Sequence, residues 1–127
     1  MRIEHLAMYV KDLELNKQFY IDFFQATANE MYHNPATGLR TYFLSFEQGP
    51  RLELMNRPEM TEAEQSLTRT GLIHFAFSAG SRPKVDELTL RLKEAGYKVL
   101  SGPRTTGDGY YESCILGPEG SQIEITE

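Results

Sequence analysis

The chain has 127 residues, a length that suits one domain and leaves no room for a second catalytic or binding domain. Its composition, with 40% hydrophobic and 24% charged residues, is that of a folded globular protein and excludes a disordered chain. The formal net charge is −5, so no basic surface is expected to attract phosphates, and nucleic acid is not an expected partner.

Cysteine usage and hydropathy predict the compartment. Cys114 is the only cysteine, so no intrachain disulfide can form, and a reducing cytoplasm is the expected location. The N-terminal segment MRIEHLAMYVKDLE carries several charges and lacks the apolar core of a signal peptide. No segment approaches the roughly 18 apolar residues of a membrane-spanning helix, so no contact with a membrane is expected.

The first half of the chain predicts a strand, a helix and three further strands. Apolar and polar residues alternate from Ile3 to Val10, which is typical of a half-buried strand. Asp12 is the predicted N-cap of a helix whose apolar residues recur at three- and four-residue spacings as far as Phe24. The three strand-like runs that follow are Ala26 to Tyr32, Leu39 to Phe46 and Arg51 to Met55.

The second half repeats this order. A strand-like run from Leu72 to Ala79 precedes a helix that begins between Ser81 and Pro83 and ends at Gly96. Three strand-like runs follow, at Lys98 to Leu100, Tyr110 to Leu116 and Ser121 to Thr126. We therefore expect an α+β fold of two tandem βαβββ modules, with mixed sheets that carry the helices on their outer faces.

A linker separates the two modules. Module one is expected at about residues 1–57, the linker at about 58–70 and module two at about 71–127, all within one domain. Inside the linker, Thr61-Glu62-Ala63-Glu64 has the spacing of a capping box, which predicts a short connecting helix.

The duplication carries a pair of polar residues. His5 and His74 lie at matching positions of the two opening strands, and Glu53 and Glu124 at matching positions of the two closing strands. Successive strand residues point to opposite sides of a sheet, so all four face away from the apolar residues that would contact the helices. Taken singly, a hydrogen-bonded strand histidine and a solvated glutamate remain the alternative; the matched pairs favour a functional site.

Two imidazoles and two carboxylates suit a divalent cation of borderline hardness, such as Ni²⁺, Co²⁺ or Zn²⁺. The two carboxylates neutralise the charge of the cation, whereas without it they would repel each other. Four protein ligands also leave octahedral positions for water or substrate oxygens. The pattern indicates a catalytic metal on a concave face more than a structural one.

At these residues the chain resembles the vicinal oxygen chelate superfamily, and within it glyoxalase I. The resemblance covers Arg2 to Thr126 and rests on four motifs: the opening I-x-H-L-A-x-x-V-x-D, the mid-chain R-L-E-L, the second opening G-L-I-H-F-A-F and the closing G-P-E-G-S-x-I-E-I. It implies paired βαβββ modules whose curved mixed sheets enclose a metal ion. It also implies that His5, Glu53, His74 and Glu124 are the metal ligands.

The resemblance implies an activity. A glyoxalase I isomerises the hemithioacetal of a 2-oxoaldehyde, such as methylglyoxal, and a thiol to an S-2-hydroxyacyl thioester, the lactoylglutathione lyase reaction. Glu124 is expected to move the proton from C1 to C2, with Glu53 as its symmetric catalytic partner. The family resemblance favours Ni²⁺ or Co²⁺ over Zn²⁺.

Departures from the glyoxalase I pattern bear on the thiol. An asparagine usually follows the first metal glutamate by four residues, whereas here Asn56 follows Glu53 by three and Arg57 takes the fourth place. Tyr9 stands where an arginine is common. Substitutes that could bind carboxylates of a thiol are Arg57 and Arg104, with ordinary surface arginines as the alternative. Residues that could line the pocket are Met55 and Tyr111, with a core or rim position as the alternative.

Other functions within the superfamily stay open. They are a metalloenzyme of the fosfomycin-resistance type that opens an epoxide, an Fe(II) ring-cleaving dioxygenase, and a binding protein of the bleomycin-resistance type without catalysis. We expect a small-molecule substrate and a homodimer, because open half-barrels would otherwise expose strand edges. The site could form within one chain or between two.

Overall fold

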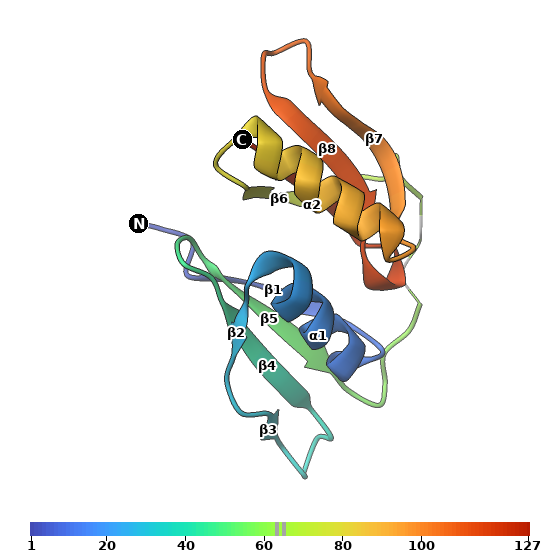
Figure 1. The fold of residues 1–127 in the computed structure, drawn as a ribbon. Coiled ribbons are helices and arrows are strands. Elements are labelled where there is room, and N and C mark those ends of the chain that lie inside the picture. Colours follow the sequence, from blue (N-terminus) through green and yellow to red (C-terminus); the bar gives the residue numbers. More distant parts are fainter. Residues whose placement is uncertain (63, 65) are drawn as a thin grey trace. The chain divides into compact units, whose positions relative to one another are not determined.

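The structure is a computed structural model that describes residues 1–62, 64 and 66–127. The chain divides into two compact units, Met1–Ala63 and Glu64–Glu127, and the boundary falls within the segment predicted as a linker (Figure 1). Each unit contains one α-helix and one mixed sheet; the second has its strands and helix in the order βαβββ, and the first has the same order with its second strand divided into two short strands. The predicted α+β fold of two βαβββ modules is therefore confirmed.

The sheet of the first unit has its N-terminal and C-terminal strands side by side. Its elements are β1 (His5–Tyr9), α1 (Leu13–Phe24), β2 (Thr27–Ala28), β3 (Tyr32–His33), β4 (Arg40–Ser45) and β5 (Arg51–Asn56). The strand order is β1-β5-β4-β2, with β3 paired to β4, and β1 runs parallel to β5 (Figure 1). The parallel pairing places the opening and closing motifs of the unit on adjacent strands.

Helix α1 begins at a side-chain cap and packs its apolar face on the sheet. The carboxylate of Asp12 accepts a hydrogen bond from the backbone of Leu15 at 2.9 Å, so the predicted N-cap is confirmed. The helix buries Phe19, Tyr20 and Phe24, and the buried residues of the sheet include Leu44, Leu52 and Leu54. This apolar layer occupies the helix side of the sheet and leaves the other side to His5 and Glu53.

One predicted strand is divided in the structure. The run from Ala26 to Tyr32 forms two short strands, β2 and β3, which both pair with β4. Between them, the side-chain oxygen of Asn29 accepts a hydrogen bond from the backbone of Phe43 at 2.7 Å. Because Ala28 pairs with Leu44 but Tyr32 pairs with Thr41, one extra residue lies on this side of the ladder and interrupts it.

The second unit repeats the arrangement. Its elements are β6 (His74–Ser78), α2 (Arg82–Glu94), β7 (Lys98–Thr105), β8 (Tyr111–Leu116), a short 3₁₀ helix η1 (Pro118–Gly120) and β9 (Gln122–Thr126). The order is β6-β9-β8-β7, with β6 parallel to β9. On the helix side, Val85 and Leu92 of α2 are buried, as are Ile115, Ile123 and Ile125 of the sheet.

Strand β7 extends beyond its predicted end at Leu100. It pairs with β8 as far as Thr105, with irregularities on either side of Ser101. Gly102 adopts a φ of 78°, and a Cβ atom there would clash with the carbonyl oxygen of Glu112 on β8. Glycine is therefore required where the two strands approach, and the Gly102-Pro103 peptide bond is cis.

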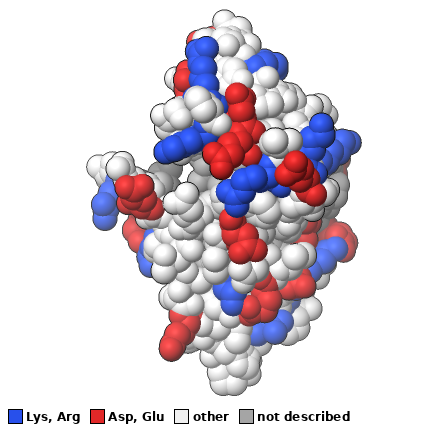
Figure 2. All heavy atoms as spheres, in the orientation of Figure 1, with Lys and Arg blue, Asp and Glu red and all other residues white. Residues whose placement is uncertain are grey.

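The segment between β5 and β6 contains turns but no helix among its described residues. Ala63, which belongs to the predicted capping box, lies outside the described residues. In the part of the chain that the structure describes, neither helix is long and apolar enough to cross a membrane. On the face drawn in Figure 2, acidic and basic side chains are interspersed.

Candidate functional site

Each unit brings its predicted histidine and glutamate together. In the first unit, His5 is paired with Arg51 and Ala7 with Glu53, so His5 and Glu53 are diagonal neighbours on one face of the sheet. The distance from His5 Nε2 to Glu53 Oε2 is 3.7 Å. In the second unit the register is the same, and His74 Nε2 lies 3.3 Å from Glu124 Oε2. The sequence prediction that each histidine shares a face with its glutamate agrees with this geometry.

The two pairs also share their degree of exposure. The His5 and His74 side chains are 41% and 39% exposed, whereas the Glu53 and Glu124 side chains are 16% and 22% exposed. The carboxylates are thus held against the sheet, while the imidazoles remain within reach of a ligand.

The spacing of each pair fits two ligands of one metal ion. Atoms that each lie about 2.1 Å from a metal are roughly 3.0–3.5 Å apart at bond angles of about 90–110°. The distance in the His74–Glu124 pair falls within this range, and that in the His5–Glu53 pair is slightly wider. Within the described residues, no three His, Cys, Asp or Glu side chains form one cluster that could hold a metal. Each unit therefore presents a two-residue donor set.

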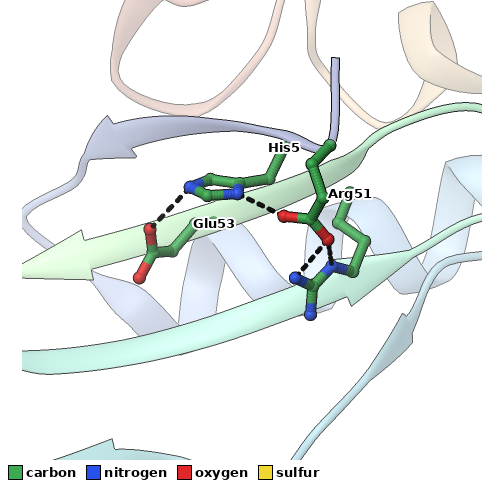
Figure 3. A network of polar contacts seen from close by, with 4 residues as sticks. His5, Arg51 and Glu53 are labelled. Atoms are coloured by element: carbon green, nitrogen blue, oxygen red, sulfur yellow. Dashed lines mark hydrogen bonds and ion pairs between the residues drawn. The ribbon is translucent and has the colours of Figure 1, made fainter. Parts of the chain in front are cut away.

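In the first unit, His5 belongs to a longer polar network (Figure 3). Its Nδ1 atom lies 2.5 Å from Glu4 Oε2, and the other Glu4 oxygen accepts hydrogen bonds from the Arg51 guanidinium. The hydrogen bond to His5 is the main cause that lowers the pKa of Glu4; desolvation opposes it, and the hydrogen bond and charge of Arg51 lower the pKa further. Glu4 is therefore an ionised acceptor at neutral pH. Neither Glu4 nor Arg51 was among the site residues predicted from the sequence.

In the second unit, a second carboxylate lies near the His74–Glu124 pair. Burial raises the pKa of Glu112, and the negative charge of Glu124 raises it further. The register pairs Cys114 with Glu124 on the face away from α2, and burial also raises the pKa of the Cys114 thiol. Glu112 was not among the predicted site residues, although its alternation with the buried Ser113 assigns it to this face.

Three of the predicted substrate residues lie near the His5–Glu53 face. Tyr9 and Met55 pair across β1 and β5, on the same face as Glu53. Arg57 follows β5, and its Nε donates a hydrogen bond to Glu59 at 2.9 Å. Glu59 raises the pKa of Arg57, and a hydrogen bond with Tyr9 adds to this effect.

The remaining three predicted substrate residues differ in position. Arg104 pairs with Glu112 across β7 and β8 and therefore lies on the His74–Glu124 side. Asn56 lies on the helix side of its sheet, where its amide donates to Val10 and Lys11 carbonyl oxygens at 2.8 and 3.0 Å. Tyr111 also lies on the helix side, because it alternates with Glu112 and its hydroxyl donates to Asp86 of α2 at 2.7 Å. Within its own unit, each of Asn56 and Tyr111 thus lies on the opposite side of the sheet from the histidine–glutamate pair.

A family comparison agrees with this fold. The profile of the Glyoxalase/Bleomycin resistance protein/Dioxygenase superfamily matches residues 2–125, and the chain belongs to this superfamily. Among curated proteins it is similar to the uncharacterised protein YqjT of Bacillus subtilis (strain 168). The two are 28% identical over 130 residues, which cover 97% of this chain and 96% of YqjT.

Two of the solved structures that are similar to this chain are those of named enzymes. A lactoylglutathione lyase from Agrobacterium tumefaciens is 25% identical, with a TM-score of 0.69, over 98% of this chain and 92% of that one. The trypanothione-dependent glyoxalase I of Leishmania major is 18% identical, with a TM-score of 0.79, over 100% of this chain and 86% of that one. At this identity the Leishmania enzyme shows the shared fold alone.

Proposed function

We propose that the protein is a glyoxalase I-like metalloenzyme. It would convert the hemithioacetal of a 2-oxoaldehyde and a thiol into an S-2-hydroxyacyl thioester. The observation that carries the proposal is the repetition, in two units, of a histidine Nε2 and a glutamate Oε2 that lie 3.7 and 3.3 Å apart on the face opposite the helix. The similarity to a lactoylglutathione lyase supports the choice of reaction.

The proposed metal site combines both pairs, His5 with Glu53 and His74 with Glu124. A divalent cation, Ni²⁺ or Co²⁺ in preference to Zn²⁺, would polarise the two neighbouring oxygens of the substrate and stabilise negative charge on them. Each pair supplies one neutral nitrogen donor and one carboxylate, so the two carboxylates together balance the charge of the divalent cation. The proposal accommodates two pairs from one chain or one pair from each chain of a homodimer.

The protein's own contribution to catalysis is proton transfer. Glu124 is proposed to take the proton from C1 and to return a proton to C2, while Glu53 holds the equivalent place in the first unit. The neighbours of the two glutamates differ: Glu124 lies near the side chain of Glu112, whereas Glu53 follows Arg51 by two residues.

The thiol is proposed to carry a carboxylate. Arg57 and Tyr9 lie beside the first pair, and Arg104 lies beside the second, so each side offers a guanidinium to an anionic group. Glutathione is the first thiol to test. Asn56 and Tyr111 have no part in the proposed site, since both hydrogen-bond on the helix side of their sheets.

The first experiment measures turnover of the preformed methylglyoxal–glutathione hemithioacetal by the absorbance of the thioester. Protein stripped of metal is compared with protein supplied with Ni²⁺, Co²⁺ or Zn²⁺. We expect activity that depends on added metal, and that is lost in Glu124→Gln and in His74→Gln. Glu87→Gln, on the exposed side of α2, is the matched control and keeps full activity.

Several outcomes would redirect the proposal. Tight metal binding without thioester formation, for any thiol tested, would refute glyoxalase activity and turn attention to epoxide substrates of the fosfomycin type. Oxygen consumption with a catechol and Fe(II) would indicate a ring-cleaving dioxygenase. Absence of metal binding would favour a binding protein of the bleomycin-resistance type.

A further inference from the structure

The two pairs have different neighbours. Across β1 and β5, the residue paired with His5 is Arg51; across β6 and β9, the residue paired with His74 is Gln122. The residue before His5 is Glu4, and the residue before His74 is Ile73. The second unit therefore has neither a carboxylate nor a guanidinium at these two positions.

Glu4 and Arg51 are joined by a backbone hydrogen bond and by side-chain hydrogen bonds. The Arg51 backbone N–H donates to the Glu4 carbonyl oxygen at 3.1 Å, and Arg51 Nε donates to Glu4 Oε1 at 2.9 Å. The Arg51 guanidinium lies over the Phe43 ring, 4.2 Å from its centre. The same ring meets the His5 imidazole edge-on at 5.5 Å. The Phe43 ring and the Glu4–Arg51 ion pair thus lie beside the exposed contact between Glu4 and His5, and Figure 3 shows this contact and the ion pair.

This arrangement determines which nitrogen of His5 carries the proton. An ionised carboxylate only accepts hydrogen bonds, so Nδ1 must be the donor to Glu4. In the neutral imidazole, Nε2 then keeps its lone pair. That lone pair and Glu53 Oε2, 3.7 Å away, are both acceptors, and a cation satisfies both of them.

The geometry points to Glu4 and Arg51 as positioning residues: Arg51 orients Glu4, and Glu4 fixes His5 in the tautomer that presents the Nε2 lone pair beside Glu53. The effect of this tautomer on metal affinity rests on the proposed function. The inference that His5 adopts the tautomer is independent of that function. Carboxylates that hold a ligating histidine in this way typically change metal affinity by about 10- to 100-fold.

The direct test is the tautomer of His5 in metal-free protein. The chain has three histidines, so long-range ¹H–¹⁵N spectra of the labelled protein at about pH 9, where an ordinary imidazole is neutral, give few signals to assign. We expect His5 to carry its proton on Nδ1 in the wild type. Glu4→Ile, which copies Ile73 of the second unit, should remove this preference, while Glu4→Gln, whose amide oxygen still accepts, should retain part of it.

Two results would overturn the inference. One is a wild-type His5 with its proton on Nε2, or on both nitrogens. The other is a Glu4→Ile spectrum in which the His5 tautomer is unchanged. His33 and His74 serve as internal references, because neither position is altered.

A second measurement uses metal affinity to test the role of Arg51. Affinity for Co²⁺, from competition with a coloured chelator, should fall about 10- to 100-fold in Glu4→Ile and by a smaller factor in Arg51→Gln, which copies Gln122. Arg51→Lys keeps the positive charge and should restore most of the affinity. The matched control is Arg82→Gln, which breaks the Arg82–Glu127 ion pair of the second unit and should bind Co²⁺ as the wild type does.

The two measurements separate the inference from the proposed function. If the wild type binds no divalent metal, the proposed function fails and the His5 tautomer still decides the inference. If the wild type binds Co²⁺ and both Glu4→Ile and Arg51→Gln bind it equally well, the role of Glu4 and Arg51 in metal binding is refuted while the metal site stands.

Discussion

Replacing Asn56 by alanine is expected to destabilise the fold without affecting metal binding. The Asn56 side chain is 8% exposed and makes three hydrogen bonds: it donates to the Val10 and Lys11 carbonyl oxygens and accepts from Arg40 at 2.8 Å. These bonds tie the end of β5 to the turn between β1 and α1. At about 1 kcal/mol for each net hydrogen bond, the free energy of unfolding should fall by about 2–4 kcal/mol.

Urea unfolding at equilibrium measures this change. With an m-value of about 2 kcal/mol per molar urea, the midpoint should fall by roughly 1–2 M, and fluorescence and circular dichroism should give the same transition. Asn56→Asp should lose more, because a carboxylate cannot donate to the two carbonyl oxygens. Asn34→Ala is the control, since Asn34 Oδ1 accepts one hydrogen bond in an exposed turn, and its loss should be below about 1 kcal/mol.

The refuting result is specific. If Asn56→Ala unfolds at the wild-type urea concentration while the KM for the hemithioacetal rises, Asn56 contacts substrate, as its position in the sequence motif first indicated. The structural assignment of Asn56 to the helix side of the sheet would then be wrong.

Three further predictions concern single residues. Glu124→Gln should reduce turnover by about 10²- to 10⁴-fold with an unchanged melting temperature; wild-type turnover would remove the proposed base. Hydrogen bonds from Lys17 and then Tyr42 lower the pKa of Glu14, so Glu14→Gln should be less stable than the wild type above about pH 4.5. In urea unfolding this difference should shrink as the pH falls through the lowered pKa, and a constant difference would contradict the assignment. Gly102→Ala should lower the free energy of unfolding by about 1–3 kcal/mol or more, because φ is 78° and the new Cβ meets the β8 backbone; a calorimetric melt like that of the wild type would contradict this.

Much of the fold could be predicted because its signals are local. Asp12 caps α1 through a residue three positions away, and strand alternation assigns His5 and Glu53 to one face without any knowledge of distant contacts. The same alternation repeats in the second half, so the duplication itself strengthened the prediction. The signals that failed were those that depend on pairing between strands.

The extra residue between β2 and β3 is an example. It lies beside two hydrogen bonds between Asn29 and Phe43, residues that come together only after β4 pairs with its neighbours. The extension of β7 to Thr105 likewise depends on β8. Neither the propensities nor the turn residues within these segments encode such contacts.

In the candidate site, too, local patterns place some residues and strand pairing places others. Alternation alone places Asn56 with Leu52 and Leu54 on the helix side, and Glu112 opposite Ser113, so both assignments were available from the sequence. The motif resemblance outweighed this signal at Asn56. The contact of Arg51 with Glu4, by contrast, needs the register of two strands that are distant in sequence, and no local pattern predicts it.

The differences between the units bear on how a duplicated site can perform an asymmetric reaction. A pair of matched histidines and glutamates would by itself treat both carboxylates alike. The residues around the two pairs remove that equivalence: the first unit places an ion pair and an aromatic ring beside its histidine, while the second places Glu112 near its glutamate. In the proposed reaction, a histidine held by neighbouring side chains suits a ligand that stays bound throughout. The neighbours of each pair, more than the pairs themselves, therefore distinguish the two units, and the proposed anchoring role falls to the first.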